Sequence, residues 1–344
     1  MGWESLLTRS IVNKLTEIHE YKGEHSIFFA MHPDAFAELT DITKIQSVHS
    51  SNSMAGVFTS DDRMKKLVMD KTRPSSRDEE EIAGYRDALN SISVNFEHIF
   101  ITPLTFLQLH QNLYKYISVE HGGDYRTSDD GMETNDVFEK IIGSYSVPSK
   151  KIAESLEGLC SFYESAVKQG IDPLIAIPIF ILDFLSIHPF SHGNGRISRL
   201  LLMLLLYKEG YTVGKYISID EIMKMNQDGY CEAMQQSIEC RSEGRKDYKP
   251  FVDYTLDIIL YAYRQLSDQI KSFMKEDMSK PAKVEKAIKK KKGEITKSEL
   301  IKLCPDVSIT TIERTLVQLQ RSDKITKIGG GRYTSYVWNS EVSK

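Results

Sequence analysis

His188-Pro-Phe-Ser-His-Gly-Asn-Gly-Arg-Ile-Ser-Arg199 joins two apolar runs in a chain of 344 residues. The runs, 173–187 and 200–207, are rich in Leu and Ile, so both predict helices that are buried on most sides. Pro189 lacks a backbone N–H and disfavours helical geometry in the residue before it, which ends the first helix. We therefore expect a mainly α-helical protein around this pair of helices and the loop between them.

The loop carries the residues of an anion site. Gly193 and Gly195 flank Asn194, which permits a sharp turn and the close approach of a ligand. The second helix begins at once, so its free N–H groups and positive dipole end face the loop. Arg196 and Arg199 share a face of its first turn, and arginine presents a rigid fork of donors that suits phosphate. With the histidine, this set indicates a base beside a polyphosphate; the alternative is a core histidine before a glycine turn, with solvated arginines.

The loop resembles the signature of Fic domains, H-P-F-x-[D/E]-G-N-G-R-x-x-R, at every fixed position except one. The resemblance implies a Fic-type helical bundle with a small β-hairpin flap, and transfer of AMP from ATP to a protein hydroxyl. His188 would be the catalytic base, since the unperturbed pKa of histidine, ~6.5, lies near the working pH. The ATP-binding residues that the resemblance implies are His192, Gly193, Asn194, Gly195, Arg196, Ile197, Ser198, Arg199, Tyr230 and Cys231.

His192 is the position that departs from the signature, where the family carries an acid that ligates Mg²⁺. Magnesium prefers carboxylate and phosphate oxygens, whereas a neutral imidazole suits softer metals. Three outcomes stay open: Mg²⁺ held weakly through phosphates and water, a softer ion such as Mn²⁺, or nucleotide binding with little turnover. We expect ATP as substrate, Mg²⁺ or Mn²⁺ as the metal with His192 as a weak ligand, and weak or modified AMP transfer.

Ser50-Ser-Asn-Ser-Met-Ala-Gly56 resembles the inhibitory motif of some Fic proteins, [S/T]-x-x-x-E-[G/N]. Ser51 and Gly56 match, but Ala55 stands where the motif has its glutamate. In the family this glutamate pairs with the second signature arginine and obstructs the γ-phosphate. The resemblance therefore implies that Arg199 is not held and that the chain is unrestrained. The alternative is an ordinary helix-capping turn.

Residues 121–131, with two glycines and an Asp-Gly pair, predict a hairpin. The segment resembles the Fic flap, which holds a target segment by strand addition. Any exposed hairpin has the same sequence features, so that alternative stays open. The target-binding residues that the resemblance implies are Thr127, Ser128, Asp129, Asp130 and Gly131.

Tyr230-Cys-Glu-Ala-Met234 resembles a Y-Y-x-A-L segment that lies beside the adenine in the family. Cys231 replaces one aromatic residue, which would weaken stacking on the base. Ordinary core packing is the alternative for Tyr230.

Composition is that of a soluble globular protein, with 41% hydrophobic and 27% charged residues. A net charge of −4 implies no general affinity for polyanions. The four cysteines show no C-x-x-C spacing, so reduced thiols in a cytoplasmic protein are expected. The first residues lack the pattern of a signal peptide, and no apolar run reaches the ~18 residues of a membrane span.

The last part of the chain, 283–344, differs in composition, with 14 Lys and Arg against 7 Asp and Glu. Helical patterns at 284–288, 298–303 and 309–319 precede a glycine-tipped hairpin, which resembles a winged helix with 309–320 as recognition helix. DNA is a possible partner, but many winged helices dock proteins instead. Residues that could contact phosphates are Lys289–Lys292, Arg314, Arg321, Lys327 and Arg332.

We expect three regions: an N-terminal helical region at 1–100, a catalytic core at 101–274 and the winged-helix domain at 283–344, after a linker at 275–281. Further helices are predicted within 4–20, 34–39, 42–48, 78–91, 104–116, 149–168 and 250–273, and a short β-rich stretch at 214–219.

Two functions remain. The first is a protein adenylyltransferase that modifies a Ser, Thr or Tyr hydroxyl of a partner or of itself. The second is a catalytically weak nucleotide-sensing regulator that acts through its winged helix. The intact His188, Arg196 and Arg199 favour the first, and His192 with the basic C-terminal region favours the second. The family resemblance also makes a homodimer plausible.

Overall fold

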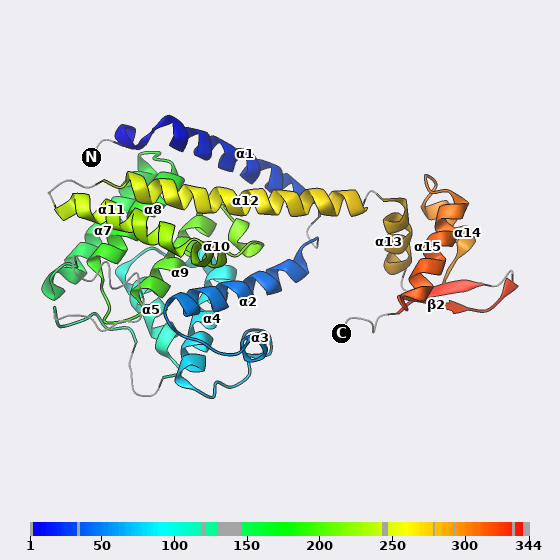
Figure 1. Ribbon diagram of the computed structural model, residues 1–344, viewed down its shortest axis with the longest axis horizontal. Coiled ribbons are helices and arrows are strands. Elements are labelled where there is room, and N and C mark those ends of the chain that lie inside the picture. The colour runs from blue at the N-terminus through cyan, green and yellow to red at the C-terminus, as the bar shows by residue number, and fades with distance from the viewer. Residues whose placement is uncertain are drawn as a thin grey trace. The chain divides into compact units, whose positions relative to one another are not determined.

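The computed structural model describes residues 3–32, 35–117, 122–129, 146–242, 247–277, 279–291, 293–331 and 334–339. By its internal contacts the chain forms two compact units, 1–266 and 267–344. The first contains the segment 188–199, and the regular secondary structure in its described part consists of helices (Figure 1). The second combines helices with a small sheet.

Two consecutive helices form the centre of the first unit. Helix α8 (Pro173–Ile187) begins with Asp172 as N-cap, whose carboxylate accepts from the N–H of Leu174, and it ends at His188. Helix α9 (Asn194–Lys208) begins at Gly193. Almost every side chain of both helices is buried, as two apolar runs without a polar face require. The predicted helix–loop–helix is thus confirmed, with the second helix starting at Asn194.

The other helices of the first unit surround this pair. The last turn of α2 contacts α9, where Asn52 and Ser51 bond Arg196 and Arg199. The long helix α12 runs beside α1, and ion pairs of Lys14 with Asp253 and of Arg264 with Glu17 join the two (Figure 1). The elements are η1 (Trp3–Leu6), α1 (Arg9–Met31), α2 (Ala37–Met54), α3 (Asp61–Met69), α4 (Arg77–Asn95), η2 (Phe96–His98), α5 (Pro103–Tyr114), η3 (Ser149–Lys151), α7 (Ile152–Lys168), η4 (Val213–Lys215), α10 (Ile219–Met225), α11 (Gln227–Ser242) and α12 (Lys249–Asp277).

Helices α4 and α5 pack with their backbones in direct contact. A Cβ atom at Gly84 would lie 2.0 Å from the carbonyl oxygen of Leu113, a distance that no side chain can occupy. A glycine is therefore required at this crossing. The contact brings Glu81 of α4 and Tyr114 of α5 to the same side of the molecule, where both meet α9.

The second unit has the element order α13 (Lys280–Lys290), β1 (Ile295–Thr296), α14 (Lys297–Leu303), α15 (Ile309–Arg321), β2 (Ile325–Ile328) and β3 (Ser335–Trp338). The strands form an antiparallel sheet in the order β1-β3-β2, with Ile295 opposite Tyr336 and Lys327 opposite the same residue on the other side. The three predicted helices and the hairpin are confirmed, and β1 is an addition. The interpretation as a winged helix stays a prediction.

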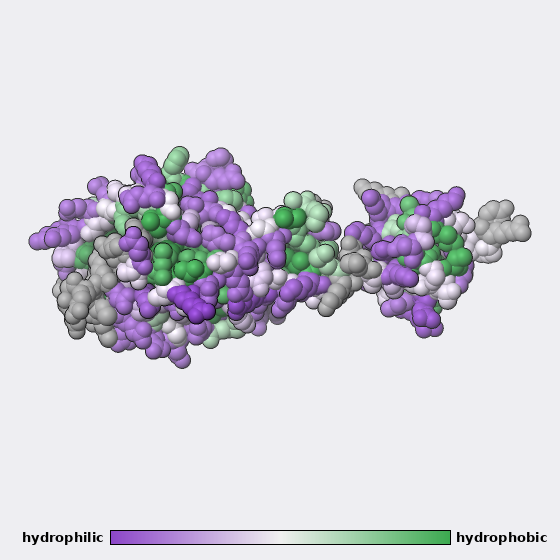
Figure 2. All heavy atoms as spheres, turned by 90° about the horizontal axis from the view of Figure 1, so that it is seen from above, coloured by the Kyte–Doolittle hydropathy of each residue, from purple (hydrophilic) through white to green (hydrophobic). Residues whose placement is uncertain are grey.

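No described helix is long and apolar enough to cross a membrane. Hydrophilic residues dominate the face seen in Figure 2, with apolar side chains scattered in small groups.

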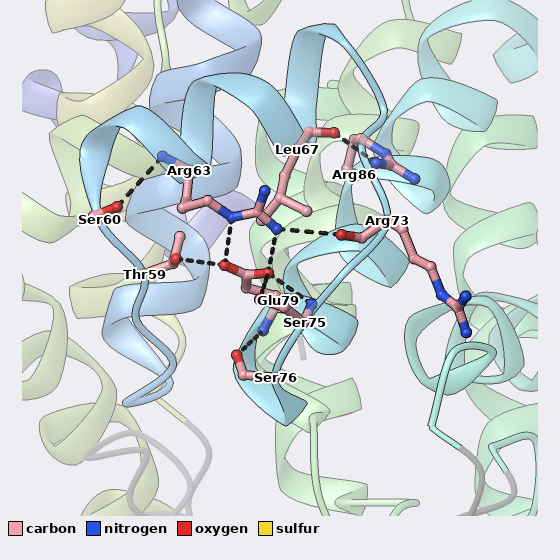
Figure 3. Close-up of polar contacts among 9 residues, drawn as sticks. All are labelled: Thr59, Ser60, Arg63, Leu67, Arg73, Ser75, Ser76, Glu79 and Arg86. Atoms are coloured by element: carbon pink, nitrogen blue, oxygen red, sulfur yellow. Dashed lines mark hydrogen bonds and ion pairs between the residues drawn. The ribbon is translucent and has the colours of Figure 1, made fainter.

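The buried carboxylate of Glu79 on α4 accepts hydrogen bonds from α3 and from the connector 70–76 (Figure 3). Arg63 donates from Nε to one oxygen of Glu79 at 2.9 Å and from Nη2 to the other at 2.6 Å. Ser75 donates from its N–H and its hydroxyl at 2.8 and 2.7 Å, and Thr59 adds its hydroxyl at 3.1 Å. We call Thr59, Arg63, Ser75 and Glu79 the Glu79 cluster. Its donors, Arg63 first, hold the pKa of Glu79 far below the ordinary value.

Several predicted elements were wrong in detail. The helices expected at 34–39 and 42–48 are one helix, α2, because no breaker separates them. The β-rich stretch at 214–219 is a 3₁₀ turn followed by α10, since Ser218 caps a helix there and no neighbouring strand is available. The linker at 275–281 is mostly helical: α12 continues to Asp277 and α13 starts at Lys280. No strand occurs in the described residues 122–129, and the remainder of the predicted hairpin lies outside the described residues.

Candidate active site

His188 ends α8 in a left-handed backbone conformation, with φ 52° and ψ 62°, and its side chain is fully buried. This conformation is uncommon for any residue except glycine, and it costs about 1 kcal/mol or more unless the surroundings impose it. Strain of this kind is concentrated at functional sites. The backbone geometry therefore singles out the same histidine that the sequence did.

Arg126 imposes that conformation from the segment 122–129. Its Nε donates to the carbonyl of His188 at 2.8 Å, and its own N–H donates to the carbonyl of Pro189 at 2.9 Å. Its Nη1 donates to the Ser128 carbonyl and to the Asp129 carboxylate, and its Nη2 donates to the Val147 carbonyl. One buried guanidinium thus joins the segment predicted as the flap to the signature loop. Sequence reasoning missed this residue, although it lies inside the segment singled out as the flap.

The side chain of Asn194 closes the loop on itself. Its Oδ1 accepts from the N–H of Phe190 at 3.0 Å, and its Nδ2 donates to the carbonyl of the same residue at 2.8 Å. The amide is therefore used to shape the loop, and the side chain is buried there.

His110 of α5 supports the other side of the loop. Its ring stacks on Phe190 with centroids 3.9 Å apart and planes 3° from parallel. Its Nδ1 accepts from the N–H of Gly123 at 2.9 Å, so its Nε2 carries the proton and donates to the carbonyl of His192 at 3.2 Å. The sequence contained no signal that this histidine lies under the loop.

Gly193 takes φ 81° immediately before α9. A Cβ atom here would be strained in this conformation and would lie 3.0 Å from both Leu113 and the Tyr114 hydroxyl. The glycine therefore lets the first turn of α9 approach α5. The N-terminus of α9, with its positive dipole end, lies at the loop as predicted.

Arg196 contacts three elements. Its Nη1 lies 2.6 Å from a carboxylate oxygen of Glu81 on α4 and 3.4 Å from the amide oxygen of Asn52 on α2. Its Nη2 donates to the Tyr114 hydroxyl on α5 at 3.1 Å. The arginine is buried, so it needs these acceptors. None of the three was predicted.

Arg199 is held by α2, contrary to the expectation that Ala55 leaves it unrestrained. Its Nε donates to the Ser51 hydroxyl at 2.7 Å, and its Nη2 donates to the Ser51 carbonyl at 2.9 Å. Ser51 lies in the last turn of α2, where exposed carbonyls and the negative dipole end attract a cation. Ala55 itself is the C-cap and Gly56 follows with φ 78°, so the segment is the end of a helix.

Asp220 of α10 places a carboxylate near Arg199, with 3.9 Å between its Oδ1 and Nε of the arginine. The Tyr85 hydroxyl donates to the same oxygen at 3.4 Å. Burial raises the pKa of Asp220 to about 6, because it outweighs the opposing effects of Arg199 and of the Ser47 and Tyr85 hydroxyls. Sequence reasoning gave this residue no role.

His192 is exposed on the loop. Within the described ranges, no group of three or more His, Cys, Asp or Glu side chains could hold a metal ion. A single exposed imidazole does not make a Mg²⁺ site, because that ion needs several oxygen ligands. The residues described do not fit the expected metal.

The remaining predicted residues differ in burial and surroundings. Tyr230 is buried against the rings of Phe251 and Tyr254, edge to face, which favours the core-packing alternative. A cavity beside it, which also touches Ser198 and Arg199, has room for about one water molecule and cannot take an adenine. Ile197 is buried, Cys231 is half-buried, and Thr127, Ser128 and Asp129 are exposed; Asp130 and Gly131 lie outside the described residues.

Comparison with known proteins points to one family. Residues 100–206 match the model of the Fic/DOC family. Protein adenylyltransferase Fic of Aedes aegypti is 28% identical over 211 residues, which are 58% of this chain and 37% of that protein. The namesake protein of Culex quinquefasciatus is 26% identical over the same length and share. The chain thus spans well under half the length of these relatives.

Solved structures share the fold. A Fic family protein from Desulfovibrio desulfuricans G20 superposes with a TM-score of 0.64 at 19% identity, covering 98% of both chains. Fic-1 from C. elegans gives a TM-score of 0.60 at 19% identity and covers 76% of this chain and 73% of its own.

Proposed function

We propose that this chain, whose residues 100–206 match the Fic/DOC family model, is a protein adenylyltransferase, which transfers AMP from ATP to a hydroxyl of a protein. The observation that carries the proposal is the signature loop. Twelve residues of the chain hold a buried histidine with a strained backbone, the first turn of α9 and two arginines on that turn.

In the proposed reaction the target hydroxyl oxygen attacks the α-phosphorus of ATP and forms a new P–O bond. His188 takes the hydroxyl proton, while the bond from the α-phosphorus to the bridging oxygen breaks and pyrophosphate leaves. The amides at the start of α9 would face the α- and β-phosphates, and Arg196 and Arg199 the β- and γ-phosphates. Rate enhancement would come mainly from positioning and charge neutralisation.

Both arginines already contact protein acceptors, so nucleotide phosphates must compete with them. Glu81 and Asn52 face Arg196, and Ser51 with Asp220 faces Arg199. Slow transfer is the expected consequence. No step of this reaction is assigned to a metal-bound group, because the described residues do not form a metal site.

The modified hydroxyl would be presented beside residues 122–129. Their backbone forms no strand pairs and Arg126 fixes them against the loop, so this edge could hold an extended target segment. The target is a Ser, Thr or Tyr of a partner protein or of the chain itself.

Intact mass spectrometry after incubation with ATP and either Mg²⁺ or Mn²⁺ tests the reaction. We expect a gain of about 329 Da, one AMP, on the chain or on an added protein. The variant H188A should lose at least about a hundredfold in rate while it still binds nucleotide. The variant H98A, at an exposed histidine of η2, serves as control and should react like wild type. Absence of AMP on every protein under both metals contradicts the proposal.

A second candidate is a nucleotide-sensing regulator with little turnover. The exposed His192 in place of an acid favours it, together with the excess of Lys and Arg in 283–344. Such a protein would bind ATP in wild-type form without transferring AMP, and it would signal through the predicted winged helix to DNA or to a protein. The same mass measurement, combined with a nucleotide-binding assay, separates the two functions.

A further inference from the structure

The carboxylate that faces Arg199 comes from an unexpected helix. Position 55 at the end of α2 is an alanine, and α2 contributes the hydroxyl and carbonyl of Ser51 to this arginine. A carboxylate within 4 Å of it is that of Asp220, from α10. Helices α2 and α10 pack together, and the hydroxyls of Ser47 and Ser218 meet between them at 2.9 Å. The acid therefore approaches Arg199 from beside α2.

Asp220 is almost completely buried, with 1% of its surface exposed. Its Oδ1 accepts from the Tyr85 hydroxyl at 3.4 Å and lies 3.9 Å from Nε of Arg199. Its Oδ2 is buried and has no hydrogen-bond partner in the part of the chain that the structure describes. The titratable or charged groups that face it are Arg199 and Tyr207 on α9 and Tyr85 on α4; α2 contributes the Ser47 hydroxyl.

We propose that Asp220 is the counter-charge that positions Arg199 in this chain, and that Asp220 takes up a proton when nucleotide phosphate binds to Arg199. The inference rests on the proposed function, because it assumes that Arg199 holds a phosphate. It deepens that function by naming what restrains Arg199 when the glutamate of the inhibitory motif is absent.

The physical reason is competition for one cation. Without nucleotide, Arg199 is the only cationic group facing the Asp220 carboxylate among the described residues. A phosphate on Arg199 would place further negative charge beside a buried carboxylate with one oxygen unpaired, which disfavours the ionised form. Since the pKa of Asp220 is already raised to about 6 by burial, a small further rise brings protonation into the neutral range. Proton uptake and nucleotide binding then favour each other.

Calorimetric titration tests the proposal with the full chain and an ATP analogue that has a methylene bridge between the α- and β-phosphorus, which cannot donate AMP. We expect binding to wild type to be about tenfold weaker at pH 8 than at pH 6, once the analogue's own protonation is subtracted. D220N should bind the analogue with no such residual pH dependence. E221Q changes the adjacent carboxylate on the same helix and should behave like wild type.

Proton uptake gives a second measurement that needs no variant. Titrations of wild type near pH 7 in buffers of different ionisation enthalpy should show uptake beyond that of the analogue alone. Absence of this uptake overturns the proposal even if D220N does not fold, and so does a residual pH dependence that is equal in wild type and D220N.

The two proposals can fail separately. A pH-linked binding that D220N abolishes, in a protein that never transfers AMP from ATP, supports the role of Asp220 and overturns only the proposed function. Failure of wild type to bind the analogue at either pH overturns both.

Discussion

Glu79 and Asp220 are both buried carboxylates beside an arginine, with 4% and 1% of their surfaces exposed, yet their pKa values move in opposite directions. Glu79 accepts donors on both oxygens from Arg63, Ser75 and Thr59 at 2.6–3.1 Å. Asp220 accepts from the Tyr85 hydroxyl at the longer distance of 3.4 Å, and its arginine lies 3.9 Å away. At Glu79 the donors outweigh the effect of burial on the pKa, whereas at Asp220 burial outweighs the donors.

The difference in hydrogen bonding also distinguishes an acid–arginine pair that stabilises the fold from one at the candidate site. The Glu79 cluster joins α3, the connector 70–76 and α4, and every group in it faces inward to the same carboxylate (Figure 3). Such a pair holds its elements in one arrangement. The pair of Asp220 and Arg199 leaves Oδ2 of Asp220 without a hydrogen-bond donor among the described residues, beside a loop with anion-binding features. An incompletely matched pair is the one that a ligand or a proton can change.

The largest loss of stability should come from removing the Glu79 carboxylate, which accepts donors on both oxygens. E79A leaves Arg63 and the Ser75 N–H without their carboxylate, so we expect a loss of about 3 kcal/mol in the free energy of unfolding. Urea unfolding at pH 7 measures it. E80A, which truncates the next acid of the same turn, should change stability by less than about 0.5 kcal/mol. Equal effects of the two variants would show that the contacts of Glu79 do not stabilise the fold more than those of a neighbouring acid.

A smaller effect of opposite sign should follow at Asp220. Its raised pKa means that its ionised form opposes folding above about pH 6, and that this penalty disappears as the pH falls toward the ordinary value. D220N should therefore be more stable than wild type by about 2 kcal/mol at pH 8 and nearly equal at pH 4. The pH dependence at Glu79 has the opposite sign. Because the pKa of Glu79 is lowered in the folded protein, its ionised form stabilises the fold at pH values above the ordinary pKa, and this stabilisation is lost as the pH falls below it.

Unfolding curves at several pH values distinguish the two carboxylates. The difference between wild type and D220N should grow as the pH rises, and that between wild type and E79A should shrink as the pH falls below about 4. A D220N curve parallel to that of wild type would mean that Asp220 does not titrate in the folded protein.

The smallest effect concerns the α2 end of the pair. S51A removes the hydroxyl that accepts from Arg199 Nε but keeps the carbonyl bond, so we expect a loss of about 1 kcal/mol in stability. S53A is the matched control, since the Ser53 hydroxyl bonds only the Ser50 carbonyl of its own helix in the described structure. Thermal unfolding measures both. No difference between them would show that Ser51 holds Arg199 through its carbonyl alone.

Sequence features predicted much of the fold because they act over short distances. Pro189 ends α8, Gly193 turns the chain with a positive φ, and continuous apolar runs bury α8 and α9; each effect needs only neighbouring residues. The same holds for the three helices of the second unit, where the N-cap Ser308 accepts from the N–H of Thr311. Predictions failed where neighbours alone mislead, as at 214–219, where β-rich composition lies in a helical setting.

At the candidate site, too, the sequence predicted the local features and missed the contacts from distant parts of the chain. The signature segment alone identified His188, Arg196 and Arg199, because those residue types at that spacing suit phosphate chemistry. The groups that hold them come from elsewhere in the chain: Arg126 under His188, Glu81 beside Arg196, and Ser51 with Asp220 around Arg199. The loss of the glutamate at position 55 suggested a free Arg199, and only the packing of α2 and α10 revealed its replacements.

By itself, the amino-acid sequence determined where the central helices begin and end, which loop they enclose and which residues in that loop suit a triphosphate. Tertiary structure alone decided which buried charges meet, and at what distance. Helix ends depend on backbone geometry within a few residues, whereas Arg199 and Ser51 are 148 positions apart in the chain. Whether such groups pair, and how strongly, follows from how whole helices pack, and no local pattern contains that information.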